Sequence, residues 1–206
     1  MTIEKQVDSG RRGLLVATCA AGGVAGLATA GALVSTFAPS ERAKAAGAPV
    51  AVDIAGLAPG EMKTVEWRGK PVWILKRSPE MIAALKSKKI DGELADPDSL
   101  RKPDELTPAY ARKNTEFRSI KEDVLVVVGI CSHLGCSPGK KFQPGPQPSL
   151  PDDWEGGFLC PCHGSTFDLA GRVYKNKPAP DNLQVPRHMY TGDTKLIIGK
   201  DAEGEA

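Results

Sequence analysis

Residues 131–136 read Cys-Ser-His-Leu-Gly-Cys, and residues 160–165 read Cys-Pro-Cys-His-Gly-Ser. We call these stretches box 1 and box 2. Together they contain four of the five cysteines and two of the three histidines in the chain of 206 residues. Thiolate sulfur and neutral imidazole are ligands for zinc or for an iron–sulfur centre. The boxes therefore predict a metal site built from two loops that the fold must bring together.

The ligand spacing in the boxes differs from that of ordinary zinc modules. His133 follows Cys131 after one intervening residue, and His163 directly follows Cys162. If each box gives one Cys and one His, as Cys131/His133 and Cys160/His163, one cysteine per box is left over and the two are free to pair. Two thiolates, two imidazoles and a possible bridge between the loops are typical of a mixed-ligand 2Fe–2S centre. Structural zinc and plain disulfides remain as alternatives.

The boxes resemble the Cys-Thr-His-Leu-Gly-Cys and Cys-Pro-Cys-His-Gly-Ser motifs of the Rieske iron–sulfur subunits of ubiquinol–cytochrome c reductase, the cytochrome bc complex. Within them only Ser132 departs from the family, which has Thr there. The resemblance extends to Trp-Arg-Gly-Lys-Pro at 67–71, Pro-Ala-Pro at 178–180 and Leu-Gln-Val-Pro at 183–186. It covers most of the chain. Rieske domains of ring-hydroxylating oxygenases usually lack the second cysteine of each box.

This resemblance implies a role for each ligand. Cys131 and Cys160 would bind the inner iron of one Rieske 2Fe–2S cluster, whereas His133 and His163 would bind the outer iron. One of the histidines would hydrogen-bond quinol and accept its proton. Replacing two thiolates with neutral imidazoles raises the reduction potential from about −400 mV to between about −150 and +300 mV, so that the centre can take an electron from a hydroquinone.

The resemblance also implies what surrounds the cluster. Cys136 and Cys162 would form a disulfide between the two loops, which requires an oxidising compartment. Leu134 would shield the cluster, and the Pro178 turn would cover it from a third side. The full set of expected neighbours of the cluster is Leu134, Gly135, Gly164, Ser165, Phe167 and Pro178.

Phe167 is an informative departure from the family. High-potential members have Tyr at this position, with a hydroxyl that donates to a ligand sulfur, while Ser165 matches the family serine that donates to a cluster sulfur. Hydrogen bonds to sulfur stabilise the reduced state, so Phe167 predicts a lower potential than in those members. The alternative is that Phe167 only packs, and that water or a backbone amide replaces the missing bond.

The first 49 residues of the chain predict an anchor and a neck. Residues 1–12 are polar and end in Arg11-Arg12, which resembles a twin-arginine export signal. Residues 13–38 carry no charge and are long enough to span a bilayer as one transmembrane helix. A cleaved signal peptide is the alternative, although its apolar region is usually shorter. Residues 39–49 are interpreted as a hinge or neck.

Residues 50–206 predict a mostly β head, an antiparallel sandwich or barrel with a small cluster-binding subdomain at about 130–182. We expect strands at 50–54, 62–67, 72–76, 123–130, 157–159, 167–168, 172–174, 183–185 and 195–198. A helix is expected from Pro79 to about Lys86, with Ser78 as its N-cap. Residues 87–122 are interpreted as a solvated excursion and 137–157 as a surface loop. His188 is expected to pack or to lie at the surface, and Cys19 is assigned no role.

These features predict the Rieske 2Fe–2S electron-transfer subunit of a cytochrome bc complex, an oxidoreductase and translocase. Its expected partners are cytochrome b, a c-type cytochrome and quinol, in a dimeric complex in the bacterial inner membrane with the head in the periplasm. A formal net charge of +2 gives no support to nucleic-acid binding. The alternatives are the Rieske small subunit of a periplasmic oxidoreductase such as arsenite oxidase, and a structural zinc module.

Overall fold

The computed structural model describes residues 8–205 of the chain. Its contacts divide the chain into one unit that ends at Ala45 and a second that begins at Ala46. In the first unit, helix α1 (Ser9–Ser35) is long and apolar enough to cross a membrane, with a mean hydropathy of 1.7. It begins before the charge-free run because Asp8 caps it, accepting from the N–H groups of Gly10 and Arg11. Residues 1–7 of the expected N-terminal segment lie outside the described residues.

Helix α2 (Glu41–Gly47) occupies most of the segment interpreted as a neck. The second unit then contains three antiparallel sheets of three strands, ordered β2-β3-β4, β1-β9-β8 and β5-β6-β7, and the pair β10-β11. The strands are β1 (Val50–Asp53), β2 (Met62–Trp67), β3 (Lys70–Lys76), β4 (Val124–Val128), β5 (Gly139–Lys141), β6 (Gly157–Leu159), β7 (Thr166–Asp168), β8 (His188–Tyr190), β9 (Lys195–Ile198), β10 (Lys200–Asp201) and β11 (Gly204–Glu205). The short helices are α3 (Pro79–Lys86), the 3-10 turn Asp91–Glu93 and α4 (Ala109–Arg112).

The sheet β2-β3-β4 is the centre of the second unit, because strands β3 and β4 are buried on both faces. Residues alternate between the faces along each strand, so that Ile74 and Val126 point into one apolar cluster, and Trp73 and Val127 into another. The first cluster lies against β1 and β9, and the second lies against β6, β7 and α3. This explains why the prediction of a buried strand from the unbroken apolar run at β4 is confirmed.

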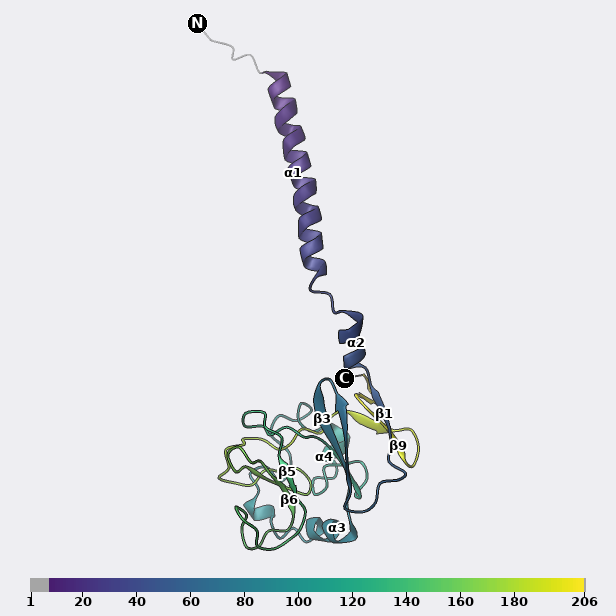
Figure 1. Cartoon of the computed structure of the whole chain (residues 1–206), viewed down its shortest axis with the longest axis vertical. Coiled ribbons are helices and arrows are strands. Elements are labelled where there is room, and N and C mark those ends of the chain that lie inside the picture. Colours follow the sequence, from purple (N-terminus) through teal and green to yellow (C-terminus); the bar gives the residue numbers. More distant parts are fainter. Residues whose placement is uncertain (1–7, 206) are drawn as a thin grey trace. The chain divides into compact units, whose positions relative to one another are not determined.

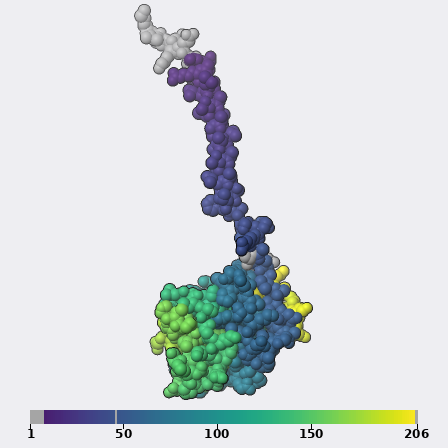
Figure 2. Space-filling model, in the orientation of Figure 1, coloured from purple at the N-terminus to yellow at the C-terminus, as the bar shows by residue number. Residues whose placement is uncertain are grey.

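Figure 1 shows β5 and β6 on one side of β3, with β1 and β9 on the other side. In Figure 2 the green surface, which includes the boxes' part of the sequence, forms one side of this unit beside the blue surface of the first strands. The predicted helix from Pro79 to Lys86 is confirmed, and Ser78 accepts a hydrogen bond from the N–H of Met81. The expected mostly β fold with one N-terminal apolar helix is therefore confirmed.

Several local predictions were wrong. Residues 172–174 form only isolated bridges, and residues 183–185 are not in a strand but hydrogen-bond to neighbouring loops. The segment 137–157 is more than a surface loop, because it contains β5 and because Trp154 is buried against Tyr174. Segments of three residues are too short for their periodicity to separate a strand from an extended loop.

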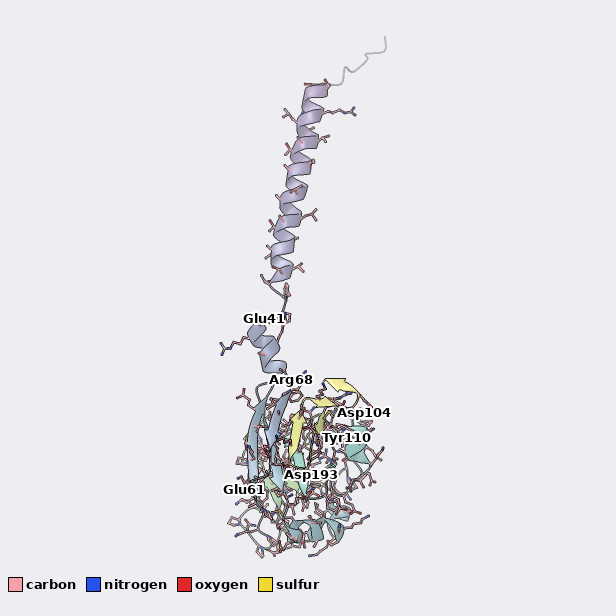
Figure 3. All side chains as sticks on the ribbon, turned by 90° about the vertical axis from the view of Figure 1, so that its right-hand side faces the viewer. Glu41, Glu61, Arg68, Asp104, Tyr110 and Asp193 are labelled. Carbon is pink, nitrogen blue, oxygen red and sulfur yellow. A yellow bond between two sulfur atoms is a disulfide. The ribbon has the colours of Figure 1, made fainter. Side chains whose placement is uncertain are left out.

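The excursion at 87–122 is not simply solvated either. Arg118 is fully buried and donates to the carbonyl oxygens of Ala170, Gly171 and Leu183. Tyr110, labelled in Figure 3 with Asp104, accepts a hydrogen bond from the backbone N–H of His188. The excursion is thus tied to the segment that follows box 2 and to the C-terminal strands.

Candidate metal centre

The two boxes have the same backbone fold. In box 1 the N–H of Cys131 donates to the carbonyl of Cys136 at 2.8 Å, and the N–H of Gly135 donates back to the carbonyl of Cys131 at 3.1 Å. In box 2 the equivalent bonds join Cys160 to Ser165 at 2.7 Å, and the fifth residue of the box to Cys160 at 3.0 Å. The fifth residue is glycine in both boxes, at φ values of 81° and 74°, a left-handed conformation that glycine adopts without strain.

Buried strands deliver both boxes to the same place. Box 1 begins three residues after β4, and box 2 begins directly after β6 and is followed by β7. The first cysteine of each box, Cys131 or Cys160, is 2 % exposed and belongs to the apolar cluster that includes Phe158 and Phe167. The tips of the loops protrude, since Leu134 in box 1 is 72 % exposed and His163 in box 2 is exposed. The fold therefore places each first cysteine inside and each loop tip outside.

Cys136 and Cys162 form a disulfide that joins the two loops, with their Cα atoms 6.6 Å apart. The bridge closes a loop of 26 residues, which by loop-closure entropy stabilises the folded state by about 3 kcal/mol. Because these two sulfurs are bonded to each other, the free thiols of the boxes are those of Cys131 and Cys160. The sulfur of Cys160 lies within 4.8 Å of both bridge sulfurs.

The two histidines of the boxes are neighbours. The rings of His133 and His163 lie 4.8 Å apart, centroid to centroid, at an interplanar angle of 84°. His133 is half-buried and His163 is exposed, in contrast to the buried cysteines. The site therefore has a sulfur side facing the core and an imidazole side facing outward.

The pKa of the Cys131 thiol is raised, chiefly because burial disfavours the thiolate. The neighbouring Cys160 adds to this rise, whereas hydrogen bonds from the N–H of His133 and the hydroxyl of Ser165 lower the pKa and so favour the thiolate. Ser165 is itself fully buried. Hydrogen bonds donated to a sulfur stabilise its thiolate form, which is the form in which a cysteine binds metal.

A third loop covers the boxes. The N–H of Ala179, in the Pro-Ala-Pro turn, donates to the side-chain oxygen of Ser165 at 3.0 Å. Ser132 in box 1 is also tied to this loop, since its hydroxyl donates to the carbonyl of Asp181 at 2.6 Å and accepts from the Asp181 N–H at 3.2 Å. Of the turn itself, Ala179 is buried, while Pro178 is exposed. Both boxes are thus hydrogen-bonded to the loop at 178–181.

The donor set fits a 2Fe–2S cluster with mixed ligands. Two buried free thiols lie beside each other, and two imidazoles lie at the outer side, which supplies the four ligands that such a centre needs. Phe167 is fully buried in β7, opposite Phe158 in β6, and belongs to the same apolar cluster as the two thiols. Leu134 is exposed at the tip of box 1, and Gly135 and Gly164 take the left-handed backbone conformation in their boxes.

Sequence reasoning missed part of this arrangement. It did not find the contacts of Asp181 with box 1, nor the burial of Arg118, because each depends on segments far apart in the chain. His188 is fully buried, as one of its two expected outcomes, and its Nδ1 lies 2.8 Å from the carbonyl of Pro186. It lies in β8, in the sheet with β1 and β9, and its neighbours are the rings of Tyr110 and Tyr190 rather than the boxes.

The chain is similar to known proteins over most of its length. The model of the Rieske [2Fe-2S] domain family matches residues 100–204. The chain is 52 % identical over 93 % of its length to the ubiquinol–cytochrome c reductase iron–sulfur subunit of Allochromatium vinosum, of which it covers 88 %. It is 39 % identical over 90 % of its length to the subunit of the same name from Bradyrhizobium diazoefficiens, of which it covers 92 %. A chain of a hyperthermophilic respiratory Complex III is similar at 26 % identity and a TM-score of 0.45, covering 88 % of this chain and 97 % of that one.

The fold and the boxes define a Rieske-type iron–sulfur protein, whose cofactor is a 2Fe–2S cluster. The chain belongs to the family of ubiquinol–cytochrome c reductase iron–sulfur subunits, which are electron-transfer subunits of an oxidoreductase complex. This membership makes cytochromes of the same complex its partners. Together with helix α1, it also indicates a membrane anchor.

Proposed function

We propose that Cys131 and Cys160 hold the inner iron of the cluster and that His133 and His163 hold the outer iron. The buried, adjacent thiols and the outward imidazoles support this division. The disulfide supports it further, because it removes the other two cysteines from the possible ligands. The hydroxyl of Ser165 then donates a hydrogen bond to the sulfur of Cys131.

One of the two histidines also accepts a proton from quinol when quinol is oxidised. When bound, the cluster supplies a one-electron acceptor in the range of about −150 to +300 mV. His163 is exposed and His133 half-exposed, so that a quinol hydroxyl can donate a hydrogen bond to an outward ring nitrogen of either residue. That nitrogen holds the proton while the electron passes to the protein. The exposed side chain of Leu134, which follows His133 in box 1, would shield the cluster on this side.

We further propose how the subunit is placed in the membrane and which proteins it works with. Residues 1–12, with Arg11-Arg12 as part of a twin-arginine signal, lie in the cytoplasm, and residues 13–38 span the bacterial inner membrane as an uncleaved anchor. Residues 39–49 form the hinge, and residues 50–206 form a periplasmic head with the cluster-binding subdomain at about 130–182. The head takes electrons from quinol at cytochrome b and passes them to a c-type cytochrome, contributing to proton translocation in a dimeric complex. The disulfide agrees with an oxidising compartment.

The single observation that carries the proposal is the meeting of two buried free thiols and two outward imidazoles on twin loops. Its test is chemical analysis of the purified protein together with electron paramagnetic resonance of the reduced form after labelling with 15N-histidine. We expect two irons and two acid-labile sulfides per chain and two coupled nitrogens. His133→Ala and His163→Ala should each abolish this signal, whereas His188→Gln, the control, should leave both couplings unchanged. Zinc without sulfide, or four sulfur ligands, would refute the assignment.

A retained anchor separates this function from that of a soluble periplasmic Rieske subunit. Intact mass measurement of the mature protein gives the position of its N-terminus. We expect residues 13–38 to be present. A mass that corresponds to a chain beginning near residue 46 would favour the soluble alternative.

A further inference from the structure

We propose that Lys102 sets the reduction potential of the cluster by neutralising the carboxylate of Asp181, a residue whose backbone is hydrogen-bonded to box 1. The inference rests on the proposed function, since it requires the cluster to be held by the boxes. Lys102 belongs to the excursion at 87–122 and is 79 residues away from Asp181 in the sequence. Neither residue belongs to the proposed ligand set.

Asp181 is close to the proposed ligands through its backbone. Its carbonyl accepts from the hydroxyl of Ser132 at 2.6 Å, and its N–H donates to the same oxygen at 3.2 Å. Ser132 stands between Cys131 and His133, one proposed ligand of each iron. The backbone of Asp181 is therefore fixed against box 1 by these two hydrogen bonds.

This carboxylate is shielded from water and has one cationic partner among the residues that the structure describes. The side chain of Asp181 is 10 % exposed, and its Oδ2 lies 2.8 Å from the Nζ of Lys102, which is 53 % exposed. Arg101, the neighbouring cation, donates instead to the carbonyl of Pro180. Exposed ion pairs contribute little to stability, but a charge of low exposure acts on its neighbours with little screening.

The backbone indicates that this contact is imposed on the excursion. Lys102 has a φ of 45°, and Ser99 and Asp104 have φ values of 53° and 67°. Such left-handed conformations are strained for residues other than glycine and persist where the surroundings hold them. Here they are held by contacts with the loop over the boxes, because Ser99 accepts from the side chain of Asn182 and Lys102 binds Asp181. Asp104, labelled in Figure 3, is largely exposed.

The consequence is electrostatic. Reduction adds one electron to the cluster, so a negative charge nearby disfavours it and a positive charge nearby favours it. Lys102 and Asp181 together are nearly neutral toward the cluster. Without Lys102, the uncompensated carboxylate lowers the potential, and without the carboxylate, the lysine raises it. A purely structural role of the pair predicts the same direction for both losses.

The test is redox titration of the full-length protein at fixed pH and ionic strength, followed by the electron paramagnetic resonance signal of the reduced cluster. At the wild-type midpoint, we expect Lys102→Met to decrease the ratio of reduced to oxidised protein about three- to tenfold. Asp181→Asn should increase this ratio, and the double variant should return it toward the wild-type value. Lys102→Arg should keep the wild-type value.

Lys88→Met is the matched control. Lys88 is 58 % exposed, has a φ of 53° and pairs with Glu116 at 2.7 Å. Among the residues that the structure describes, no hydrogen bond or ion pair joins Lys88 or Glu116 to the boxes or to the loop at 178–181. Its removal should leave the potential unchanged. Equal shifts for Lys102→Met and Lys88→Met, or shifts of the same sign for Lys102→Met and Asp181→Asn, would overturn the proposal.

Loss of the cluster in a variant and an unexpected wild-type signal also bear on the proposal. If Lys102→Met loses its cluster, Asp181→Asn decides alone, and a potential that does not rise in this variant overturns the inference. If the wild-type protein shows no coupling to two histidine nitrogens, the proposed function fails and this inference fails with it. A normal wild-type signal with unresponsive variants rejects only the inference.

Discussion

The side-chain oxygen of Ser165 accepts a hydrogen bond from the N–H of Ala179 at 3.0 Å, and so joins box 2 to the loop that covers it. The same hydroxyl donates to the buried thiol of Cys131. One side chain thus connects the second box, the covering loop and a sulfur that belongs to the first box. Because Ser165 is fully buried, water is not at hand to replace either bond.

Replacing Ser165 with alanine should therefore lower the reduction potential. In the wild type, the hydroxyl stabilises the more negative, reduced state by donating a hydrogen bond. Each 1.4 kcal/mol by which this stabilisation decreases lowers the reduction potential of a one-electron couple by about 60 mV. Redox titration measures the shift. Ser137→Ala, at an exposed serine just outside box 1, is the control and should not change the potential. An unchanged midpoint in Ser165→Ala would show that this hydroxyl does not act on the cluster.

Replacing Phe167 with tyrosine should raise the potential. Phe167 is fully buried in the apolar cluster that contains Cys131 and Cys160, so an added hydroxyl has to find an acceptor there, and a ligand sulfur provides one. Phe142→Tyr, at a half-buried ring that packs edge-on against Phe158, tests whether any added hydroxyl has this effect. No rise in Phe167→Tyr would support the alternative that this side chain only packs.

Removal of the disulfide should destabilise the protein. The double replacement of Cys136 and Cys162 with serine releases a loop of 26 residues and should lower the free energy of unfolding by about 3 kcal/mol. Thermal unfolding and the rate of cluster loss measure the effect. Cys19→Ser, outside the boxes, should change neither quantity. Equal stability of the double variant and the wild type would contradict the constraint assigned to the bridge.

Acidification should destabilise the fold through His188. Burial lowers the pKa of His188 to about 4, whereas the unfolded side chain has its ordinary value of 6.5. Between these values the unfolded state binds the additional proton, so the stability contributed by neutral His188 is present above pH 6.5 and is lost as the pH falls toward 4. The full difference corresponds to about 3 kcal/mol.

The measurement is the difference in melting temperature between wild type and His188→Gln as a function of pH. We expect this difference to change between pH 6.5 and 4 and to be constant above that window. The buried ring has Tyr110 and Tyr190 as aromatic neighbours. The hydrogen bond with the carbonyl of Pro186, and after it the charge of Asp201, raise the pKa of His188 but do not offset the effect of burial. A difference that is independent of pH would show that His188 does not charge on unfolding.

Much of the fold follows from local patterns. The unbroken apolar run at β4 predicts a strand buried on both faces, and Ser78 followed by Pro79 predicts the start of α3, because caps and periodicity act over a few residues. The short segments at 172–174 and 183–185 were wrongly predicted to be strands, because their structure depends on contacts beyond these few residues. Their backbone groups are paired by distant loops, and no local pattern reports such partners.

The sequence by itself determined which side chains are available as ligands and how they are spaced in two boxes, and it predicts a centre with sulfur and nitrogen ligands. Ligand preference is a property of the side chains, and a six-residue loop can be recognised from its own residues. Only the tertiary structure decided that Asp181 lies against box 1, that Lys102 neutralises it, and that Arg118 and His188 are buried. The two contacts of Asp181 join residues that are 49 and 79 positions apart in the sequence, and such contacts depend on how the whole chain packs.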